Sequence, residues 1–289
     1  MKNKSDTQPA SLDAKLSDFR VKQGSKQGSS GQKFSLSDFD PAAKPFSDGD
    51  KVKNLEVVAE IGARINALQD LFYAEHRRKF LIILQGMDTS GKDGTVRAVF
   101  SQADPLGLRV VGFNAPTRQE KDHDYLWRVH REVPGAGEIV IFNRSHYEDV
   151  LVPRVHGSID GDECRRRYEH INEFERMLTE TGTVIVKCYL HISKDEQKVR
   201  LEERLLDGSK HWKFDPNDLV ERDFWNGYMA AYENAIAATG TKWAPWYVVP
   251  ADSKTHRNVM IGKLVVETLE AMELAYPPPN PEYFKLKVN

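Results

Sequence analysis

The sequence is poor in cysteine and has no long apolar run. Its two cysteines, Cys164 and Cys188, are not part of any CxxC pair, which excludes a disulfide scaffold and a cysteine-rich zinc site. The longest uncharged apolar stretches are about half of what a membrane crossing needs, and the start MKNKSDTQPA has no apolar signal core. We therefore expect a cytoplasmic protein that does not engage a membrane.

An excess of charge of one sign is also missing. The 41 basic side chains are balanced by 43 acidic ones, so the net charge is −2 over 289 residues. This balance excludes a globally basic protein that wraps nucleic acid, and we expect no nucleic-acid partner, although a local basic groove is compatible with it. The length suits one large domain, or one domain with an extension.

The N-terminal segment, residues 1–50, differs in composition from the rest of the chain. It is rich in Ser, Asp, Lys, Gln and Gly and has no helical or strand period, which predicts a mobile arm. Phe34, Leu36 and Phe39 are isolated apolar points for docking on the domain or on a neighbouring subunit. The domain is expected at 51–289, and near its end AYPPPNPEYF predicts an extended polyproline strap.

From residue 51 onward, short apolar runs alternate with stretches of helical period. The apolar runs predict buried strands at 80–85, 108–113, 138–142, 183–190 and 246–250. The periodic stretches predict helices at about 51–75, 92–103, 122–132, 163–181, 194–206, 218–239 and 255–274. This alternation is typical of an α/β fold with a parallel sheet and helices on both faces, in which ligands bind at the carboxyl ends of the strands.

The loop after the first predicted strand carries the most specific motif. GMDTSGKDG is a GxxxxGK loop with a strand before it and a helix after it. Its backbone N–H groups, the helix N-terminus and the lysine are expected to bind phosphate. The predicted phosphate-binding residues of this loop are Gly86, Thr89, Ser90, Gly91, Lys92, Asp93 and Gly94.

Two carboxylates in this loop are unusual for a phosphate site. Asp93 stands where a Ser or Thr usually holds Mg²⁺, and Asp88 lies inside the loop. A carboxylate among phosphate-binding amides is favourable when a metal ion lies between it and the phosphates, and the alternative is an Asx residue that caps a turn. We predict that Asp88 is a metal ligand.

The loop after the third strand offers a second metal ligand and a phosphate ligand. The strand ends in Asn143, and the nearest acids are Glu148 and Asp149. Asp149 is predicted to bind metal, with an acid at a helix N-terminus as an equal alternative. Arg144 at the strand end is a good phosphate fork, and His146 fits a hydrogen-bonded structural role better than a catalytic one.

Further arginines and lysines follow the second and fourth strands. Arg118 stands where an acceptor phosphate would lie, and Arg200 and Arg204 are four residues apart on one predicted helix. A flexible basic segment with Lys210 and Lys213 comes next, and together they predict a lid at about 200–222 that closes over phosphate. The alternative is an exposed helix whose arginines pair with neighbouring glutamates.

Taken in order, these motifs resemble those of the family-2 polyphosphate kinases. The resemblance runs from about residue 50 to 275 and is carried by GMDTSGKDG, LWRVHREVPGAGEIVIFNRSHYEDVLVPRVHG, KVRLEERL, HWKFDPNDL and APWYVVPAD. It implies a P-loop kinase-like three-layer αβα sandwich with a helical lid, Mg²⁺ or Mn²⁺ as cofactor, polyphosphate and adenine nucleotides as substrates, and a homodimer or homotetramer. FNRSHYEDV looks like the branch, often called class III, that phosphorylates both AMP and ADP.

The same resemblance implies roles for individual residues. Asp88 and Lys92 match the essential loop residues of the family, and its phosphate-binding arginines are matched by Arg118, Arg144, Arg200 and Arg204. The polyphosphate-synthesising branch typically has aspartate at the position of Asn143, which moves the second metal assignment to Asp149.

We thus predict transfer of the terminal phosphoryl group of polyphosphate to AMP and ADP, giving ADP and ATP. The acceptor phosphate is already an anion at neutral pH, so no general base is needed. Two alternatives remain at this stage. One is an ATP-dependent nucleoside monophosphate kinase that uses the same loop, and the other is a non-catalytic protein that binds a phosphate chain or a nucleotide.

Overall fold

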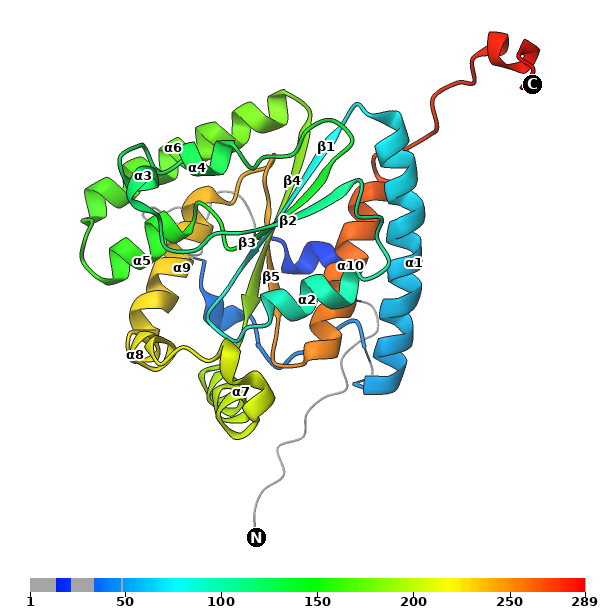
Figure 1. Cartoon of the computed structure of the whole chain (residues 1–289). Helices are drawn as coiled ribbons and strands as arrows, with labels where there is room; N and C mark the ends of the chain where they lie inside the picture. The colour runs from blue at the N-terminus through cyan, green and yellow to red at the C-terminus, as the bar shows by residue number, and fades with distance from the viewer. Residues whose placement is uncertain (1–13, 22–33, 48, 289) are drawn as a thin grey trace.

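A parallel five-stranded sheet forms the centre of the protein (Figure 1). The structure is a computed structural model, and it describes residues 14–21, 34–47 and 49–288. The strand order is β2-β3-β1-β4-β5. The strands are β1 (Lys79–Gln85), β2 (Leu108–Gly112), β3 (Ile139–Asn143), β4 (Thr183–His191) and β5 (Trp246–Pro250).

All five strands agree with the sequence prediction to within one residue at each end. The central strand β1 shows why, since its residues from Phe80 to Leu84 are fully buried. Ile82 is paired with Ile141 of β3 on one side and Val186 of β4 on the other. A strand buried on both faces must be apolar throughout, and such a run is readable from the sequence alone.

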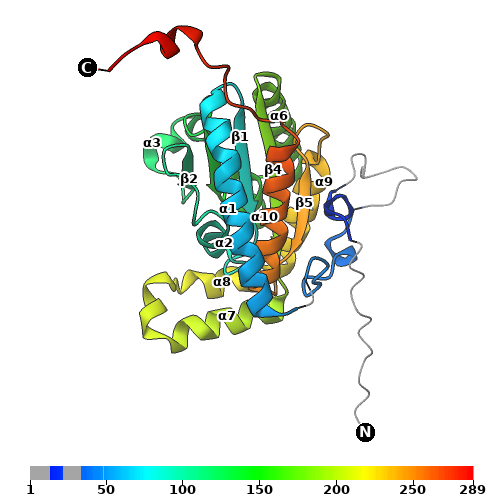
Figure 2. The same ribbon diagram turned by 90° about the vertical axis from the view of Figure 1, so that its right-hand side faces the viewer.

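Helices cover both faces of the sheet and make a three-layer αβα sandwich, as predicted (Figures 1 and 2). On one face lie α1 (Lys51–Glu75), α2 (Lys92–Val99) and α10 (Lys254–Glu270). On the other face lie α5 (Glu148–Val155), α6 (Gly161–Glu180) and α9 (Trp225–Thr239). The active-site loops leave the sheet between these two layers.

A helical hairpin follows β4 and projects beyond the end of the sheet (Figure 2). It consists of α7 (Lys194–Leu206), a 3₁₀ helix η3 (Gly208–Lys213) and α8 (Asn217–Asp223). The hairpin contains residues 200–222, for which a lid is predicted, and we refer to it as the lid. The helix predicted at 218–239 is in fact two helices, α8 and α9, which are separated at Phe224.

The prediction of a helix at 122–132 is wrong. Only α3 (Arg118–Lys121) and α4 (Trp127–His130) are helical in this region. The Asp124 carboxylate accepts the N–H of Leu126 at 2.9 Å. This side-chain turn competes with a continuous helix.

The segment before α1 is packed against the domain in both parts that the structure describes. Leu16, Val21 and Leu36 are buried, and the Val21 N–H donates to the Trp246 carbonyl at 2.9 Å. The expectation of a mobile arm therefore does not hold for residues 14–21 and 34–47. For residues 1–13 and 22–33 the prediction lies outside the described residues.

The C-terminal segment extends away from the domain, at the opposite end from the lid (Figures 1 and 2). Residues 275–288 are exposed, and a 3₁₀ helix η4 (Pro281–Lys285) interrupts them. Within the part of the chain that the structure describes, no helix is both long enough and apolar enough to cross a bilayer.

Candidate active site

The GxxxxGK loop connects β1 to α2 and has the backbone conformation of a phosphate cradle. Gly86, Thr89 and Gly91 have φ of 152°, 61° and 103°. A Cβ on Gly86 would lie 2.7 Å from the Leu190 carbonyl oxygen, and one on Gly91 would overlap the Arg257 guanidinium. Glycine is therefore required at both ends of the loop, where the chain turns and neighbouring groups approach closely.

Lys92 opens α2 and turns back into the loop. Its Nζ donates to the Gly86 carbonyl at 2.7 Å and to the Met87 carbonyl at 3.3 Å. Burial and the nearby charge of Arg144 together lower the pKa of Lys92 to about 8, against the opposing charge of Asp88. The ammonium group is still largely protonated at neutral pH, and a bound phosphate would favour its charged form.

Two buried arginines support the loop from behind. The five N–H donors of Arg200 are all engaged, by the carbonyls of Thr89, Ser90, Ala251 and Asp252 and by Glu196 Oε1. The sequence predicts that Arg200 is a lid arginine that binds phosphate. In the structure its guanidinium instead holds the loop.

The second buried arginine, Arg257, comes from the first turn of α10 and was missed by sequence reasoning. Its guanidinium donates to the Ser90 carbonyl at 2.9 Å and to Asn258 Oδ1 at 3.0 Å, both neutral acceptors. Burial and the charge of Arg200 together lower the pKa of Arg257 to about 9. The sequence contained no signal for it beyond an Arg-Asn pair in the first turn of a helix.

An open cavity of about 790 Å³ lies between this loop and the lid, and we call it the basic groove. Eight of its lining side chains are basic and five are acidic. The basic ones are Lys92, Arg144, Arg200, Arg204, Lys210, Lys213, Lys254 and Arg257. The structure thus brings together the predicted loop and lid cations, and adds Lys254 and Arg257 to them.

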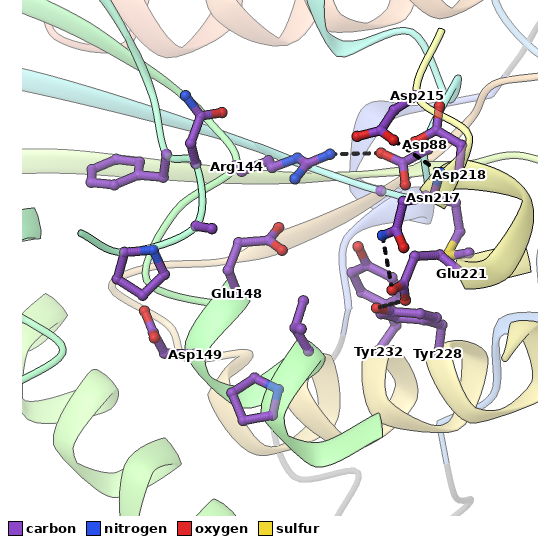
Figure 3. A pocket seen from close by; sticks show the side chains of 18 of the residues that line it. Asp88, Arg144, Glu148, Asp149, Asp215, Asn217, Asp218, Glu221, Tyr228 and Tyr232 are labelled. Atoms are coloured by element: carbon purple, nitrogen blue, oxygen red, sulfur yellow. Dashed lines mark hydrogen bonds and ion pairs between the residues drawn. The ribbon is translucent and has the colours of Figure 1, made fainter. Parts of the chain in front are cut away.

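A second cavity of about 340 Å³ has the opposite charge, and we call it the acidic cavity (Figure 3). Its lining contains two arginines, Arg128 and Arg144, and six carboxylates: Asp88, Glu148, Asp149, Asp215, Asp218 and Glu221. Aromatic and apolar side chains complete the wall, among them Phe113, Pro116, Val152, Tyr228 and Tyr232.

The carboxylates of the acidic cavity repel one another. Burial and the charge of Asp88 together raise the pKa of Asp218 to about 6. Burial also raises the pKa of Glu148. A divalent cation beside a phosphate group in this cavity would offset part of this negative charge.

The donor chemistry of this cavity fits magnesium. Carboxylate oxygens are hard ligands of the kind that Mg²⁺ prefers. Among the described residues, no three His, Cys, Asp or Glu side chains converge as a ready-made metal cage. Mg²⁺ at phosphate-transfer sites is usually held by only one or two carboxylates together with water and substrate phosphates, so this arrangement is compatible with it.

The basic groove and the acidic cavity share eight lining residues, and Asp88 and Arg144 are the ion pair among them. The others are Phe113, Asn114, Ala115, Asp215, Asn217 and Asp218. Arg144 Nη2 donates to Asp88 Oδ1 at 2.6 Å. Arg144 has a φ of 64°, and its N–H donates to the Leu84 carbonyl at 3.0 Å. A left-handed residue at the end of β3 thus points a guanidinium at the loop after β1.

Other predicted residues are placed differently. Asp149 lies away from Asp88 in the acidic cavity (Figure 3) and accepts from Arg128 at 3.3 Å, so the structure does not bring the two predicted metal ligands together. Asp93 accepts from Asn143 Nδ2 at 2.6 Å. Arg118 is exposed at the start of α3 and lines neither cavity.

Comparison with known proteins agrees with this geometry. The family model of polyphosphate kinase 2 (PPK2) matches residues 49–277. A relative from Meiothermus ruber, named AMP/ADP-polyphosphate phosphotransferase, is 51% identical over 247 residues, which cover 86% of this chain and 92% of the relative. An ADP-polyphosphate phosphotransferase from Rhodopseudomonas palustris is 38% identical, over 92% of this chain and 94% of the relative. The crystal structure of polyphosphate kinase 2 from Arthrobacter aurescens superposes with a TM-score of 0.86 at 43% identity, over 95% and 94% of the two chains.

Proposed function

The chain belongs to the polyphosphate kinase 2 family, and from this premise we infer that it is a phosphotransferase that uses polyphosphate to phosphorylate AMP and ADP. The relative that is 51% identical is named for both acceptors. The observation that carries the assignment to this site is the meeting of a basic groove with an acidic cavity at Asp88 and Arg144. The alternative of an ATP-dependent monophosphate kinase is not favoured, because the named relatives are polyphosphate enzymes.

We propose that polyphosphate lies in the basic groove. A phosphate chain carries about one negative charge per unit, so it needs a row of cations rather than a single lysine. Lys92 and the loop amides would hold the terminal units, and Lys210 and Lys213 of the lid would hold units further along. Arg200 would act from beneath, by fixing the loop, and Arg257, which lines the groove, would add a charge-assisted contact to a bound phosphate.

The acidic cavity is the proposed acceptor site. Its aromatic and apolar wall suits a nucleoside, and its junction with the groove at Arg144 suits the acceptor phosphate. The negative charge of the remaining wall would disfavour a second phosphate chain, so the two substrates are told apart by charge as well as by shape.

Mg²⁺, or Mn²⁺ in its place, is the proposed cofactor, with Asp88 as one ligand. Asp218 suits a second ligand better than the predicted Asp149, because Asp218 lines both the groove and the cavity together with Asp88, whereas Asp149 lines the acidic cavity alone. Each of the two carboxylates has an arginine partner at 3.3 Å, Arg204 for Asp218 and Arg128 for Asp149. The metal would neutralise charge that builds up between donor and acceptor phosphates.

The proposed chemistry requires little of the protein beyond binding and alignment. The acceptor phosphate is an anion at neutral pH, so its oxygen attacks without prior removal of a proton. Lys92, Arg144 and Arg204 would hold the phosphoryl oxygens and keep the attacking and leaving oxygens in line. Closure of the lid would exclude water, which otherwise competes with the nucleotide as acceptor.

We further propose that the protein works in the cytoplasm, where its adenine nucleotide substrates are. We also propose that it forms a homodimer or homotetramer. Exposed apolar side chains at Tyr283, Phe284 and Leu286 of the C-terminal segment support self-association. Light scattering after size-exclusion chromatography would measure the mass, and a monomer at micromolar concentration would contradict the proposal.

The proposed activity can be tested with purified protein, Mg²⁺, long-chain polyphosphate and AMP, in the absence of ATP. Chromatography should show ADP first and then ATP. Formation of ADP alone would restrict the activity to AMP. If products form only when ATP replaces polyphosphate as donor, the assignment of the donor is wrong.

A further inference from the structure

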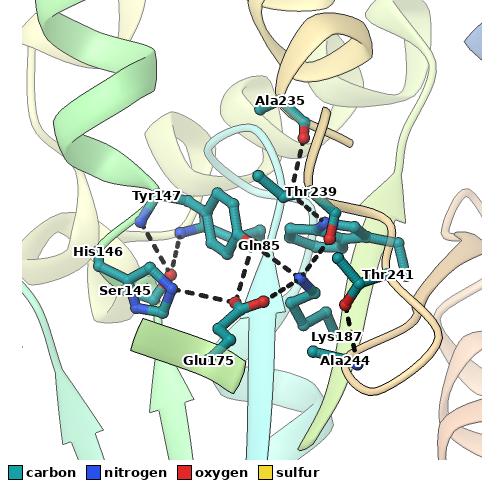
Figure 4. A network of polar contacts seen from close by, with 11 residues as sticks. Gln85, Ser145, His146, Tyr147, Glu175, Lys187, Ala235, Thr239, Thr241 and Ala244 are labelled. Atoms are coloured by element: carbon teal, nitrogen blue, oxygen red, sulfur yellow. Dashed lines mark hydrogen bonds and ion pairs between the residues drawn. The ribbon is translucent and has the colours of Figure 1, made fainter. Parts of the chain in front are cut away.

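A fully buried ion pair lies behind the turn that carries Arg144 (Figure 4). Lys187 of β4 and Glu175 of α6 both have 0% exposure. Lys187 Nζ donates to Glu175 Oε2 at 2.6 Å, to the Tyr147 hydroxyl at 2.8 Å and to the Thr239 carbonyl at 2.8 Å. All three donors of the ammonium group are therefore satisfied without water.

The other oxygen of Glu175 binds two consecutive residues of the turn. Glu175 Oε1 accepts from the Tyr147 hydroxyl at 2.9 Å and pairs with His146 Nε2 at 3.2 Å. The Tyr147 hydroxyl accepts from Lys187 and donates to Glu175, so it closes a three-membered ring of contacts. We call Lys187, Glu175 and Tyr147 the buried triad.

The same turn is held on its other side by Gln85, the last residue of β1. With its amide oriented so that both ends are satisfied, Gln85 accepts from the Ser145 N–H and hydroxyl, each at 3.0 Å, and donates to Glu148 Oε1 at 3.0 Å. The turn from Arg144 to Glu148 is thus bound at Ser145, His146, Tyr147 and Glu148.

Stability alone does not account for a charged triad at this place. A buried ion pair is often no more stabilising than apolar residues of the same volume, because removing two charges from water offsets their attraction. What a charged, hydrogen-bonded network adds is a defined geometry, since each donor has only one satisfactory direction. The geometry held here is that of Arg144 and Glu148, which line the acidic cavity, whereas the triad residues line neither cavity.

We propose that the buried triad is a positioning device for phosphoryl transfer. It holds the turn so that Arg144, in its left-handed conformation, points at Asp88 where the two cavities meet. This inference deepens the proposed function and rests on it. Lys187, Glu175 and Tyr147 are positioning residues, which act on the reaction through Arg144 and Glu148.

Tyr147→Phe is the most selective perturbation. It removes one hydroxyl and leaves Lys187 and Glu175 in direct contact, so the protein should keep its fold. We expect kcat with polyphosphate and AMP to fall about tenfold, because small misplacements of a binding group cost rate more than affinity, while KM for both substrates changes less than twofold. Tyr168→Phe is the matched control. Tyr168 is a buried tyrosine of α6, the helix that carries Glu175, and its hydroxyl contacts Cys164.

A double-mutant cycle separates positioning from general support of the core. In an Arg144→Lys background, Tyr147→Phe should have little further effect, because the group that the triad positions has already been changed. A loss of the same size in both backgrounds would overturn the proposal. So would an unchanged kcat in Tyr147→Phe.

Hydrogen exchange of the backbone gives a readout that does not depend on activity. The amides of residues 144–149 should exchange faster in Tyr147→Phe than in the wild type, and Tyr168→Phe should leave them unchanged. If the wild type shows no polyphosphate-dependent activity, the proposed function fails and this measurement still decides the positioning role. Unchanged exchange in Tyr147→Phe would refute it.

Discussion

Replacement of Arg257 by methionine should weaken substrate binding without weakening the fold. Arg257 is 2% exposed, and its donors reach only the neutral acceptors Ser90 O and Asn258 Oδ1. A buried charge of this kind is unfavourable until an anion approaches, and the lowering of its pKa to about 9 by burial and by Arg200 expresses the same effect. Methionine removes this unfavourable charge and fills most of the space.

The size of the effect follows from the interaction that is lost. A charge-assisted contact to a bound phosphate contributes about 1.5–3 kcal/mol, which corresponds to roughly a tenfold to hundredfold change in affinity. We therefore expect KM for polyphosphate to rise by at least about tenfold, with KM for AMP nearly unchanged. Without substrates, the midpoint of thermal unfolding should stay the same or rise.

Steady-state kinetics and calorimetry on the same preparations would measure both quantities. Arg97→Met is the matched control, because Arg97 is an exposed residue of α2 that lines neither cavity. A melting temperature lowered by more than about 5 °C together with an unchanged KM for polyphosphate would show that Arg257 is structural, and would refute the reasoning.

Three further predictions concern single residues. Lys92→Ala should retain less than a tenth of wild-type turnover with an unchanged circular dichroism spectrum, because Arg200 holds the loop through its backbone carbonyls. Greater activity would count against the role of Lys92. Arg204→Ala should lower kcat by roughly a hundredfold to a thousandfold if Arg204 neutralises charge in the transition state. Arg200→Ala should chiefly lower the melting temperature, since Arg200 makes five hydrogen bonds to the scaffold. Equal effects of the two variants on kcat and on the melting temperature would contradict this division. Burial, with the charge of Lys44, lowers the pKa of His256 from 6.5 to about 4. The unfolded chain thus binds more protons than the folded protein between these two pH values, and the free energy of unfolding should fall by about 2–3 kcal/mol as the pH drops from 6.5 to 4. Urea unfolding of His256→Gln should show a smaller loss over this range than the wild type. Identical pH profiles of the two proteins would exclude His256 as the group responsible.

The sheet could be predicted because its strands are buried on both faces. Such strands have unbroken apolar runs, and the runs are local in sequence. The helix expected at 122–132 failed because one side chain, Asp124, captures the Leu126 N–H and starts a new turn. The packing of Leu16 and Leu36 was hidden for another reason, since isolated apolar residues in a polar segment show no period.

The phosphate loop was readable for the same reason as the strands. The residues from Gly86 to Gly94 are contiguous, and their GxxxxGK pattern is by itself typical of one loop conformation. Arg257 and Asp218 reach the site from segments far away in the sequence, and only the folded sheet places α10 and the lid beside β1. Arg118 is the opposite case. It follows a strand in the sequence and was therefore predicted at the site, but its side chain lines neither cavity.

The central claim is that donor and acceptor occupy separate cavities of opposite charge. The direct test is to measure KM for polyphosphate and for AMP in two variants. Lys210→Ala/Lys213→Ala alters only the basic groove, and Val152→Trp narrows only the acidic cavity. We predict that the first variant raises KM for polyphosphate and leaves KM for AMP unchanged, and that the second does the reverse. If both constants change together in either variant, or if the pattern is reversed, the two-cavity account is contradicted.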